Sequence, residues 1–219
     1  MTRCVGVGGS WSWKGGWWQP DSPLWTYLRQ HGLLQAFPAV KDRYGNILRP
    51  ATPFEWDTGI GSSLKFWRSA EARCRIWKVA GDALAYYLDG IDYEDRNVIT
   101  HSHGLQPALF CAAKGVEIRR LLSIAGPYRE DMQATAAKAI ANIGYWLHVY
   151  DPDKDRIGWL GGMFDGDVGN QRTQPLAINL PIKKISHSRL VSDPAAFPHW
   201  QEAGLIAFLQ SPEEELRRA

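Results

Sequence analysis

The sequence predicts an α/β fold in a single domain, with one mostly parallel central sheet and helices on both of its faces. Short apolar runs alternate along the chain with segments whose apolar residues recur at helical spacing, as in proteins built on parallel sheets. Polar residues able to do chemistry stand just after several of the apolar runs. In such a fold ligands bind beyond the carboxyl ends of the strands, so we expect these polar residues to meet there.

Length and composition are those of one globular domain without a strong charge. The 219 residues fit a single domain over 1–219, and the apolar fraction of 45% and charged fraction of 22% are typical of soluble proteins. A formal net charge of +2 favours neither nucleic acid nor an anionic membrane as a partner. No leader pattern and no apolar run of transmembrane length is present, so we expect a cytoplasmic protein without stable membrane insertion.

We expect neither a metal nor an organic cofactor. Cys4, Cys74 and Cys111 are odd in number and far apart, which predicts reduced, buried thiols rather than a disulfide framework or a metal site. The glycines after the first apolar run do not predict dinucleotide binding, because Trp11 stands where the third glycine of G-x-G-x-x-G belongs and no helix follows at once. These glycines suit a loop whose backbone N–H groups face a ligand oxygen.

The beginning of the chain predicts a strand, a loop and a helix. Residues 3–8 form an apolar run that stops at two glycines. Ser22 and Pro23 supply an N-cap and an N1 proline for the helix. Residues 34–40 are a second predicted strand, and residues 41–63, rich in Gly and Pro without a clear period, are a predicted lid or cleft loop.

The middle of the chain alternates between the two kinds of element. Apolar residues at helical spacing predict the helices, and short runs rich in Ile, Val and Leu predict the strands. In order, these are helix 69–88, strand 97–100, helix 105–114, strand 118–124, helix 130–143 and strand 145–150.

The last quarter of the chain predicts a loop, a strand and a helix. Residues 158–173 are a long Gly-rich segment and a second predicted lid or cleft loop. Residues 180–185 are the last predicted strand, and a final helix follows Asp193-Pro194. The charged tail 212–219 is expected to fray.

A serine stands at the turn between a predicted strand and a predicted helix, in Asn97-Val-Ile-Thr-His-Ser-His-Gly104. Strand, sharp turn carrying a serine, and helix are the parts of a nucleophile elbow. Gly104 provides the small residue that is needed where strand and helix backbones pass closely. Thr100 occupies a place where glycine is usual, so the match to G-x-S-x-G is partial.

An acidic turn and a histidine follow later strands. Asp151, Asp153 and Asp155 come after the strand 145–150, and His187 comes after the last one, which gives the chain order Ser, Asp, His. A serine hydroxyl needs an imidazole to take its proton, and the imidazole needs a carboxylate to fix its tautomer and stabilise its charge. Strand ends on one edge of a parallel sheet would allow all three to meet.

At this point the sequence resembles the α/β-hydrolase superfamily, in particular its small lipase- and esterase-like members. The motifs that carry the resemblance are Thr100-His-Ser-His-Gly104, Ser123-Ile-Ala-Gly-Pro127, Asp155-Arg-Ile157 and Ser186-His-Ser-Arg-Leu190. By that resemblance Ser102 would be the nucleophile and His187 the general base. Asp155 would be the acid, because an apolar residue stands two places on, with Asp153 and Asp151 as alternatives.

The resemblance also implies an oxyanion hole made by backbone N–H groups. One donor would be His103, the residue after the nucleophile, and the other Ser10, in the loop after the first strand. Val7-Gly8-Gly9-Ser10 resembles the family's His-Gly-x, with glycine in place of the histidine, and Trp11 is next in line as donor.

The other histidines are given different roles. His101 and His103 flank the serine, and we interpret them as packing or cleft residues because elbow neighbours point away from the nucleophile. His199 is the alternative base. His31, at a helix end, and His148, inside a strand, are predicted to be structural.

The resemblance implies a serine hydrolase that cleaves a small-molecule carboxylic ester, such as a lipid or acyl ester, through an acyl-enzyme. Trp17, Trp18, Trp56 and Trp159 lie in predicted loops and would favour an apolar acyl group. Two alternatives stay open: a catalytically inactive binding protein with the same fold, and a related acyltransferase or amidase, because fold and triad do not fix the acceptor.

Overall fold

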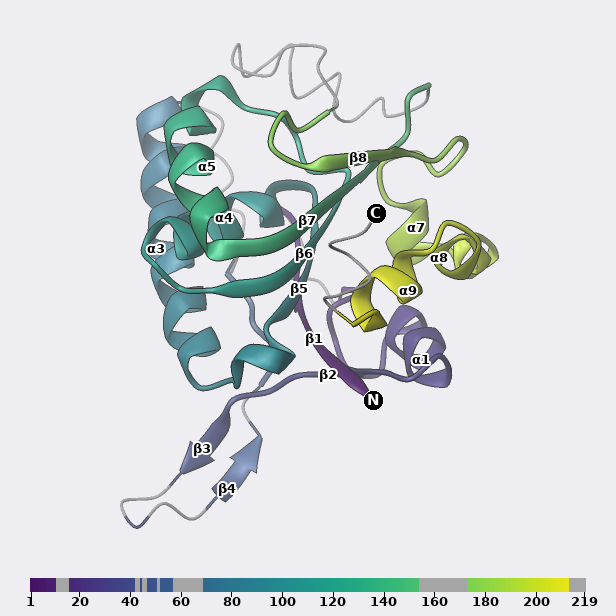
Figure 1. Ribbon diagram of the computed structural model, residues 1–219, viewed down its shortest axis with the longest axis horizontal. Coiled ribbons are helices and arrows are strands. Elements are labelled where there is room, and N and C mark those ends of the chain that lie inside the picture. The colour runs from purple at the N-terminus through teal and green to yellow at the C-terminus, as the bar shows by residue number, and fades with distance from the viewer. Residues whose placement is uncertain are drawn as a thin grey trace.

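A computed structural model describes residues 1–10, 16–41, 44, 47–50, 52–56, 69–153 and 173–212. Its main sheet has six strands in the order β2-β1-β5-β6-β7-β8, and every neighbouring pair is parallel (Figure 1). The strands are β1 (Thr2–Val7), β2 (Leu33–Gln35), β5 (Asn97–His101), β6 (Ile118–Ile124), β7 (Ile143–Tyr150) and β8 (Ile178–Pro181). The predicted parallel α/β sheet in a single domain is thereby confirmed.

Helices cover both faces of this sheet, as predicted (Figure 1). One face carries α3 (Ala70–Asp89), α4 (Leu105–Ala113) and α5 (Gln133–Ala139). The other carries α1 (Pro23–Gln30), α7 (Arg189–Ser192), α8 (Pro198–Glu202) and α9 (Leu205–Gln210). Short 3₁₀ turns lie at Tyr93–Asp95, Ser102–Gly104, Glu130–Met132, Ile140–Asn142 and Pro194–Ala196.

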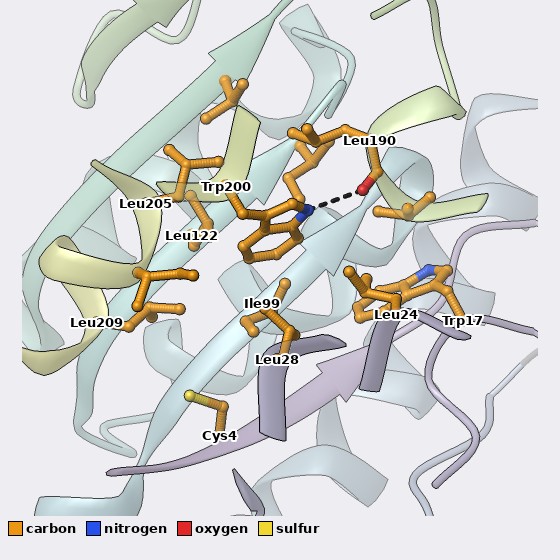
Figure 2. Packing of buried hydrophobic residues seen from close by; sticks show 14 of the residues in the cluster. Cys4, Trp17, Leu24, Leu28, Ile99, Leu122, Leu190, Trp200, Leu205 and Leu209 are labelled. Carbon is orange, nitrogen blue, oxygen red and sulfur yellow. Dashed lines mark hydrogen bonds between the residues drawn. The ribbon is translucent and has the colours of Figure 1, made fainter. Parts of the chain in front are cut away.

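Two hydrophobic cores result, one on each side of the sheet. Successive strand residues point to opposite faces, so Leu121 packs in the core under α3 and α4 whereas Leu122 packs in the core under α1 and α9. In the second core, shown in Figure 2, the fully buried Trp200 lies among leucine side chains and its indole N–H donates to the carbonyl of Leu190 at 2.8 Å. The central strand β5 is buried along its whole length, as expected for a strand covered on both faces.

Several predicted elements form as expected, for the expected reasons. The strand 118–124 is β6, with the same bounds. The Ser22 hydroxyl accepts the N–H of Trp25 at 3.2 Å and so caps α1. The Ser69 hydroxyl caps α3 in the same way, by accepting the N–H of Ala72 at 3.0 Å.

Other elements differ from the prediction. The expected strand 34–40 is two strands, because Pro38 interrupts it: β2 joins the main sheet, and β3 (Ala39–Lys41) pairs antiparallel with β4 (Ile47–Pro50). That hairpin projects away from the main sheet (Figure 1) and lies partly within the predicted lid or cleft loop 41–63, in which no strand could be located from the sequence. The last strand is β8, at 178–181 rather than 180–185.

The predicted helices of the second half are shorter and divided. The expected helix 130–143 is α5 flanked by two 3₁₀ turns, and Ile143 already begins β7. The final helix, predicted after Asp193-Pro194, is divided into a 3₁₀ turn, α8 and α9, and the short helix α7 before it was not predicted. Pro194 and Pro198 start new segments, and Gly204, at φ +73°, separates α8 from α9. Residues 57–68, 154–172 and 213–219 lie outside the described residues, and they include the end of the first predicted lid loop and most of the second loop and of the predicted frayed tail. Among the helices that the structure describes, none is both long and apolar enough to cross a membrane.

Candidate active site

Ser102 directly follows β5 and has a φ of +53°, in the left-handed region that non-glycine residues rarely adopt. The 3₁₀ turn Ser102–Gly104 then leads straight into α4. A Cβ atom at Gly104 would lie 2.5 Å from the carbonyl oxygen of Val7 and 2.6 Å from that of Gly8, so only glycine fits. Strand, strained serine and closely packed glycine give this turn the geometry of a nucleophile elbow.

The loop after β1 lies directly against this elbow. A Cβ atom at Gly9 would stand 2.8 Å from Cβ of Ser102. The hydroxyl of Ser10 is 3.3 Å from Nδ1 of His103, and the indole N–H of Trp56 donates to the carbonyl of Gly8 at 2.7 Å. The structure therefore brings together Ser10 and His103, the two residues expected to supply oxyanion donors; Trp11 lies outside the described residues.

His103 is held as a neutral imidazole. Its ring stacks on Trp77, with centroids 5.6 Å apart and planes at 25°. Burial lowers the pKa of His103 well below its usual value, and the positive charge of Arg129 lowers it further. The Arg129 guanidinium carbon lies 4.9 Å from the centroid of the Trp77 ring. The guanidinium donates two hydrogen bonds to the carboxylate of Asp131, at 2.8 and 2.9 Å.

His187 lies in a turn between β8 and α7 and is buried. The residue before it, Ser186, has a φ of +48°, and its N–H donates to Oδ2 of Asp151 at 2.8 Å. The carbonyl of His187 accepts from Nε2 of His101 at 2.9 Å, so His101 carries its proton on Nε2. Because His101 precedes Ser102, this bond brings the His187 turn and the elbow together; the two imidazole rings are 5.0 Å apart.

Two of the three carboxylates of the acidic turn, Asp151 and Asp153, lie in the described part of the chain and differ in burial. Asp151 directly follows β7 and is 0% exposed, and its Oδ1 accepts the N–H of Asp153 at 2.9 Å. Asp153 is exposed. Asp155, the expected triad acid, lies outside the described residues, as does Trp159.

The remaining histidines lie away from the elbow. His148 is buried in β7 and its Nδ1 is 2.8 Å from the Ser123 hydroxyl. His199 is on α8 and pairs with Glu202 at 2.9 Å, and His31 ends α1.

A cavity of about 560 Å³ lies beside the elbow. Gly9, Ser10 and His101 line it on the elbow side, and Ser188, the residue after His187, lines it on the other. Its apolar wall is formed by Trp17, Trp18, Pro23, Val191 and Phe197. The cavity thus touches the loop after β1, the last residue of β5 and the residue after His187, whereas Ser102 and His187 themselves are not among its lining residues.

The described residues include no group of three or more His, Cys, Asp and Glu side chains placed to hold a metal ion. The three cysteines are free thiols: Cys4 and Cys111 are buried, and Cys74 is half-buried rather than buried as expected. Burial raises the pKa of Cys111 to about 12, so it is an unreactive thiol at neutral pH.

No protein-family model matches the chain, and neither does any curated protein. Among solved structures it is similar to one described as a predicted CIB-like hydrolase from Thermoplasma acidophilum, with 11% identity, a TM-score of 0.52 and coverage of 94% of this chain and 87% of that one. Acyl-protein thioesterase 2 from Zea mays matches with 14% identity and a TM-score of 0.46, over 95% of this chain and 94% of that one. At such identities the first likeness shows the fold alone: the chain has the α/β-hydrolase fold, as the sequence predicted.

Proposed function

We propose that the protein is a serine hydrolase that cleaves a carboxylic ester through an acyl-enzyme. The observation that carries the proposal is the strained backbone of Ser102 at the strand-to-helix turn. The turn that carries His187 is held next to it, because the carbonyl of His187 accepts a hydrogen bond from His101, the residue before Ser102. Non-glycine residues in the left-handed region persist where their surroundings hold them, and they cluster at active sites.

In the proposed reaction, Oγ of Ser102 attacks the carbonyl carbon of the ester while the imidazole of His187 takes the hydroxyl proton. The bond from the carbonyl carbon to the alcohol oxygen then breaks, and the imidazolium gives the proton to the leaving alcohol. A water molecule, deprotonated by the same imidazole, releases the acid and restores Ser102. We assign the carboxylate that holds the imidazole to Asp155.

The backbone N–H groups of Ser10 and His103 are the proposed oxyanion donors. Their support is the close contact between the loop after β1 and the elbow, which puts the two residues within hydrogen-bonding distance of each other. Removing one donor of an oxyanion hole typically costs about 10²–10³ in rate.

The cavity beside the elbow is the proposed substrate site. Trp17, Trp18 and Phe197 in its wall favour an apolar acyl group, and its volume of about 560 Å³ leaves room for more than an acetyl group. The substrate we propose is therefore a lipid or acyl ester.

A fluorophosphonate probe tests the proposed nucleophile, because Ser102 would displace fluoride from phosphorus and become covalently labelled. We expect labelling of the wild type at Ser102, none in Ser102→Ala, and slow labelling in His187→Ala. Ser211→Ala, at the end of α9, is the matched control and should label like the wild type. A folded wild-type protein that resists the probe would rule out the proposed nucleophile.

A further inference from the structure

Two side chains, from the ends of β5 and β7 on either side of β6, hold the backbone around His187. On one side, the N–H of Ser186 donates to Asp151, at the end of β7, at 2.8 Å. On the other, the carbonyl of His187 accepts from His101, the last residue of β5, at 2.9 Å. The peptide between Ile185 and Ser186 and the peptide between His187 and Ser188 are therefore both held by side chains at the strand ends.

Asp151 also holds the turn that leads to the other carboxylates. Its two oxygens accept one backbone N–H each, Oδ2 from Ser186 and Oδ1 from Asp153. The side chain is 0% exposed, so these bonds are shielded from water and the carboxylate fixes two turns relative to each other. One of these turns carries His187, and the other continues towards Asp155.

The turn before His187 needs such support. Lys184 and Ser186 both have positive φ, at +67° and +48°, which is unfavourable for side chains other than glycine. A backbone of this kind keeps one conformation only when its surroundings hold it. The bond from Ser186 to Asp151 is made at one of the strained residues themselves.

We propose that Asp151 and His101 are positioning residues, which fix the His187 imidazole relative to Ser102. The inference rests on the proposed serine-hydrolase function. Neither residue needs to touch the reacting atoms: Asp151 binds the N–H of Ser186, and His101 binds the carbonyl of His187 itself. Displacing a catalytic group by about 1 Å can cost about 10² in rate, so the expected effect is large.

A matched pair of substitutions tests His101. In His101→Gln the side-chain amide can still donate to the carbonyl of His187, whereas in His101→Leu no donor is left. Per active site titrated with the fluorophosphonate, we expect His101→Leu to lower kcat about 10- to 100-fold with KM within about twofold, and His101→Gln to stay within about threefold of wild type. His31→Leu, which changes a histidine at the far end of α1, should leave both constants unchanged.

Asp151→Asn tests the contact with Ser186. The amide has only one oxygen, so its NH₂ group faces one of the two backbone N–H groups that the carboxylate accepts, and that hydrogen bond is lost. We expect a similar fall in kcat and faster exchange of the Ser186 amide hydrogen, with Asp92→Asn in an exposed turn as the control. If Asp151 were instead the triad acid, Asp151→Asn would cost about 10⁴ in kcat and Asp155→Asn would have little effect, which would overturn the positioning role.

The outcomes separate this inference from the proposed function. A wild type that resists the probe counts against the hydrolase function. In that case, hydrogen exchange of the Ser186 amide in Asp151→Asn still tests whether Asp151 holds that amide. A wild type that labels, with kcat per titrated site unchanged in His101→Leu and Asp151→Asn, overturns the positioning role. Should Asp151→Asn fail to fold, the comparison of His101→Gln with His101→Leu decides: equal kcat in the two rejects the inference.

Discussion

The hydroxyl of Ser10 and Nδ1 of His103 lie 3.3 Å apart, so their side chains join the loop after β1 to the Ser102–Gly104 turn. Both residues are also the proposed backbone donors of the oxyanion hole. The side-chain bond therefore fixes the separation of two groups that have to point at one oxygen atom. Because burial lowers the pKa of His103 and favours its neutral form, Nδ1 of its ring can accept a hydrogen bond from the Ser10 hydroxyl.

Ser10→Ala keeps the backbone N–H and removes only this bond. A neutral hydrogen bond contributes about 1 kcal/mol, so we expect kcat to fall about fivefold with KM unchanged. His103→Phe should have a comparable effect, and the double variant should be no slower than the slower single one, because both remove the same contact. Additive losses in this double-mutant cycle would show that the bond does not link the two loops.

Folding stability should fall in mild acid because of His103. Burial lowers the pKa of His103 in the folded state. As the pH falls, the unfolded chain therefore takes up a proton at a higher pH than the folded protein does. The stability that is present above the unfolded pKa of about 6.5 is lost as the pH falls below that value. Between about pH 7.5 and pH 5.5 this group should cost about 1 kcal/mol. Urea unfolding at the two pH values measures the loss, and His103→Phe should reduce it; an equal loss in that variant would refute the assignment.

Gly104→Ala should impair the site as well as the fold. Its new Cβ would lie 2.5 Å from the carbonyl oxygen of Val7, and overpacking of this kind costs about 1–3 kcal/mol. Gly144→Ala is the control, because its Cβ would lie 2.7 Å from the carbonyl of Arg119, away from the elbow. Both should unfold at lower urea concentration, but only Gly104→Ala should slow fluorophosphonate labelling of the folded protein.

The cavity should select the acyl group. Among chromogenic esters we expect medium-length acyl chains to give higher kcat/KM than acetyl, because Trp17, Trp18 and Phe197 wall the cavity. Ser192 also lines it and is exposed, so Ser192→Trp should fit and narrow it. That variant should lose activity on longer chains more than on acetyl, and Ser192→Ala should not; a wild-type preference for acetyl would contradict the apolar site.

Trp200 should be a large contributor to stability. It is fully buried, donates to the carbonyl of Leu190 at 2.8 Å, and lies in the core between the sheet and the C-terminal helices (Figure 2). Trp200→Ala should lower the free energy of unfolding by about 3–5 kcal/mol, through the cavity and the unpaired carbonyl. Trp200→Phe keeps most of the volume and should cost less, which calorimetry or urea unfolding can measure.

The sequence predicts the fold wherever local pattern decides. The strand at Ile118–Ile124 and the capped helix after Ser69 formed with nearly the predicted bounds, since apolar periodicity and capping are local properties. The break at Pro38 and the division of the last helix were missed. Prolines stand at both places, but the sequence does not show that β3 leaves the main sheet to pair with β4, or that a new helix begins at Pro198.

The sequence proposes residues for the candidate site but not the contacts between them. Ser102 and His187 were singled out by their motifs and by the order of Ser, Asp and His along the chain, and their roles stay predictions. The bonds from Asp151 to Ser186 and from His101 to His187 join residues 35 and 86 positions apart, and both depend on turn backbones that no pattern specifies. The role of Asp155 and both lid loops stay predictions.

The two outer strands of the main sheet also limit how the molecule can aggregate. β2 has three residues, and β8 has four and ends in Pro181, which lacks an N–H group. An exposed edge strand is a template on which a strand of another molecule can add, and its reach is set by the number of unpaired backbone groups. The exposed side chain of Ile178 on β8 is the apolar contact that such an added strand would meet. Because β8 pairs only with Leu147–Tyr150, the first half of β7 has no partner strand on that side in the described part of the chain, whereas β6 lies inside the sheet between β5 and β7.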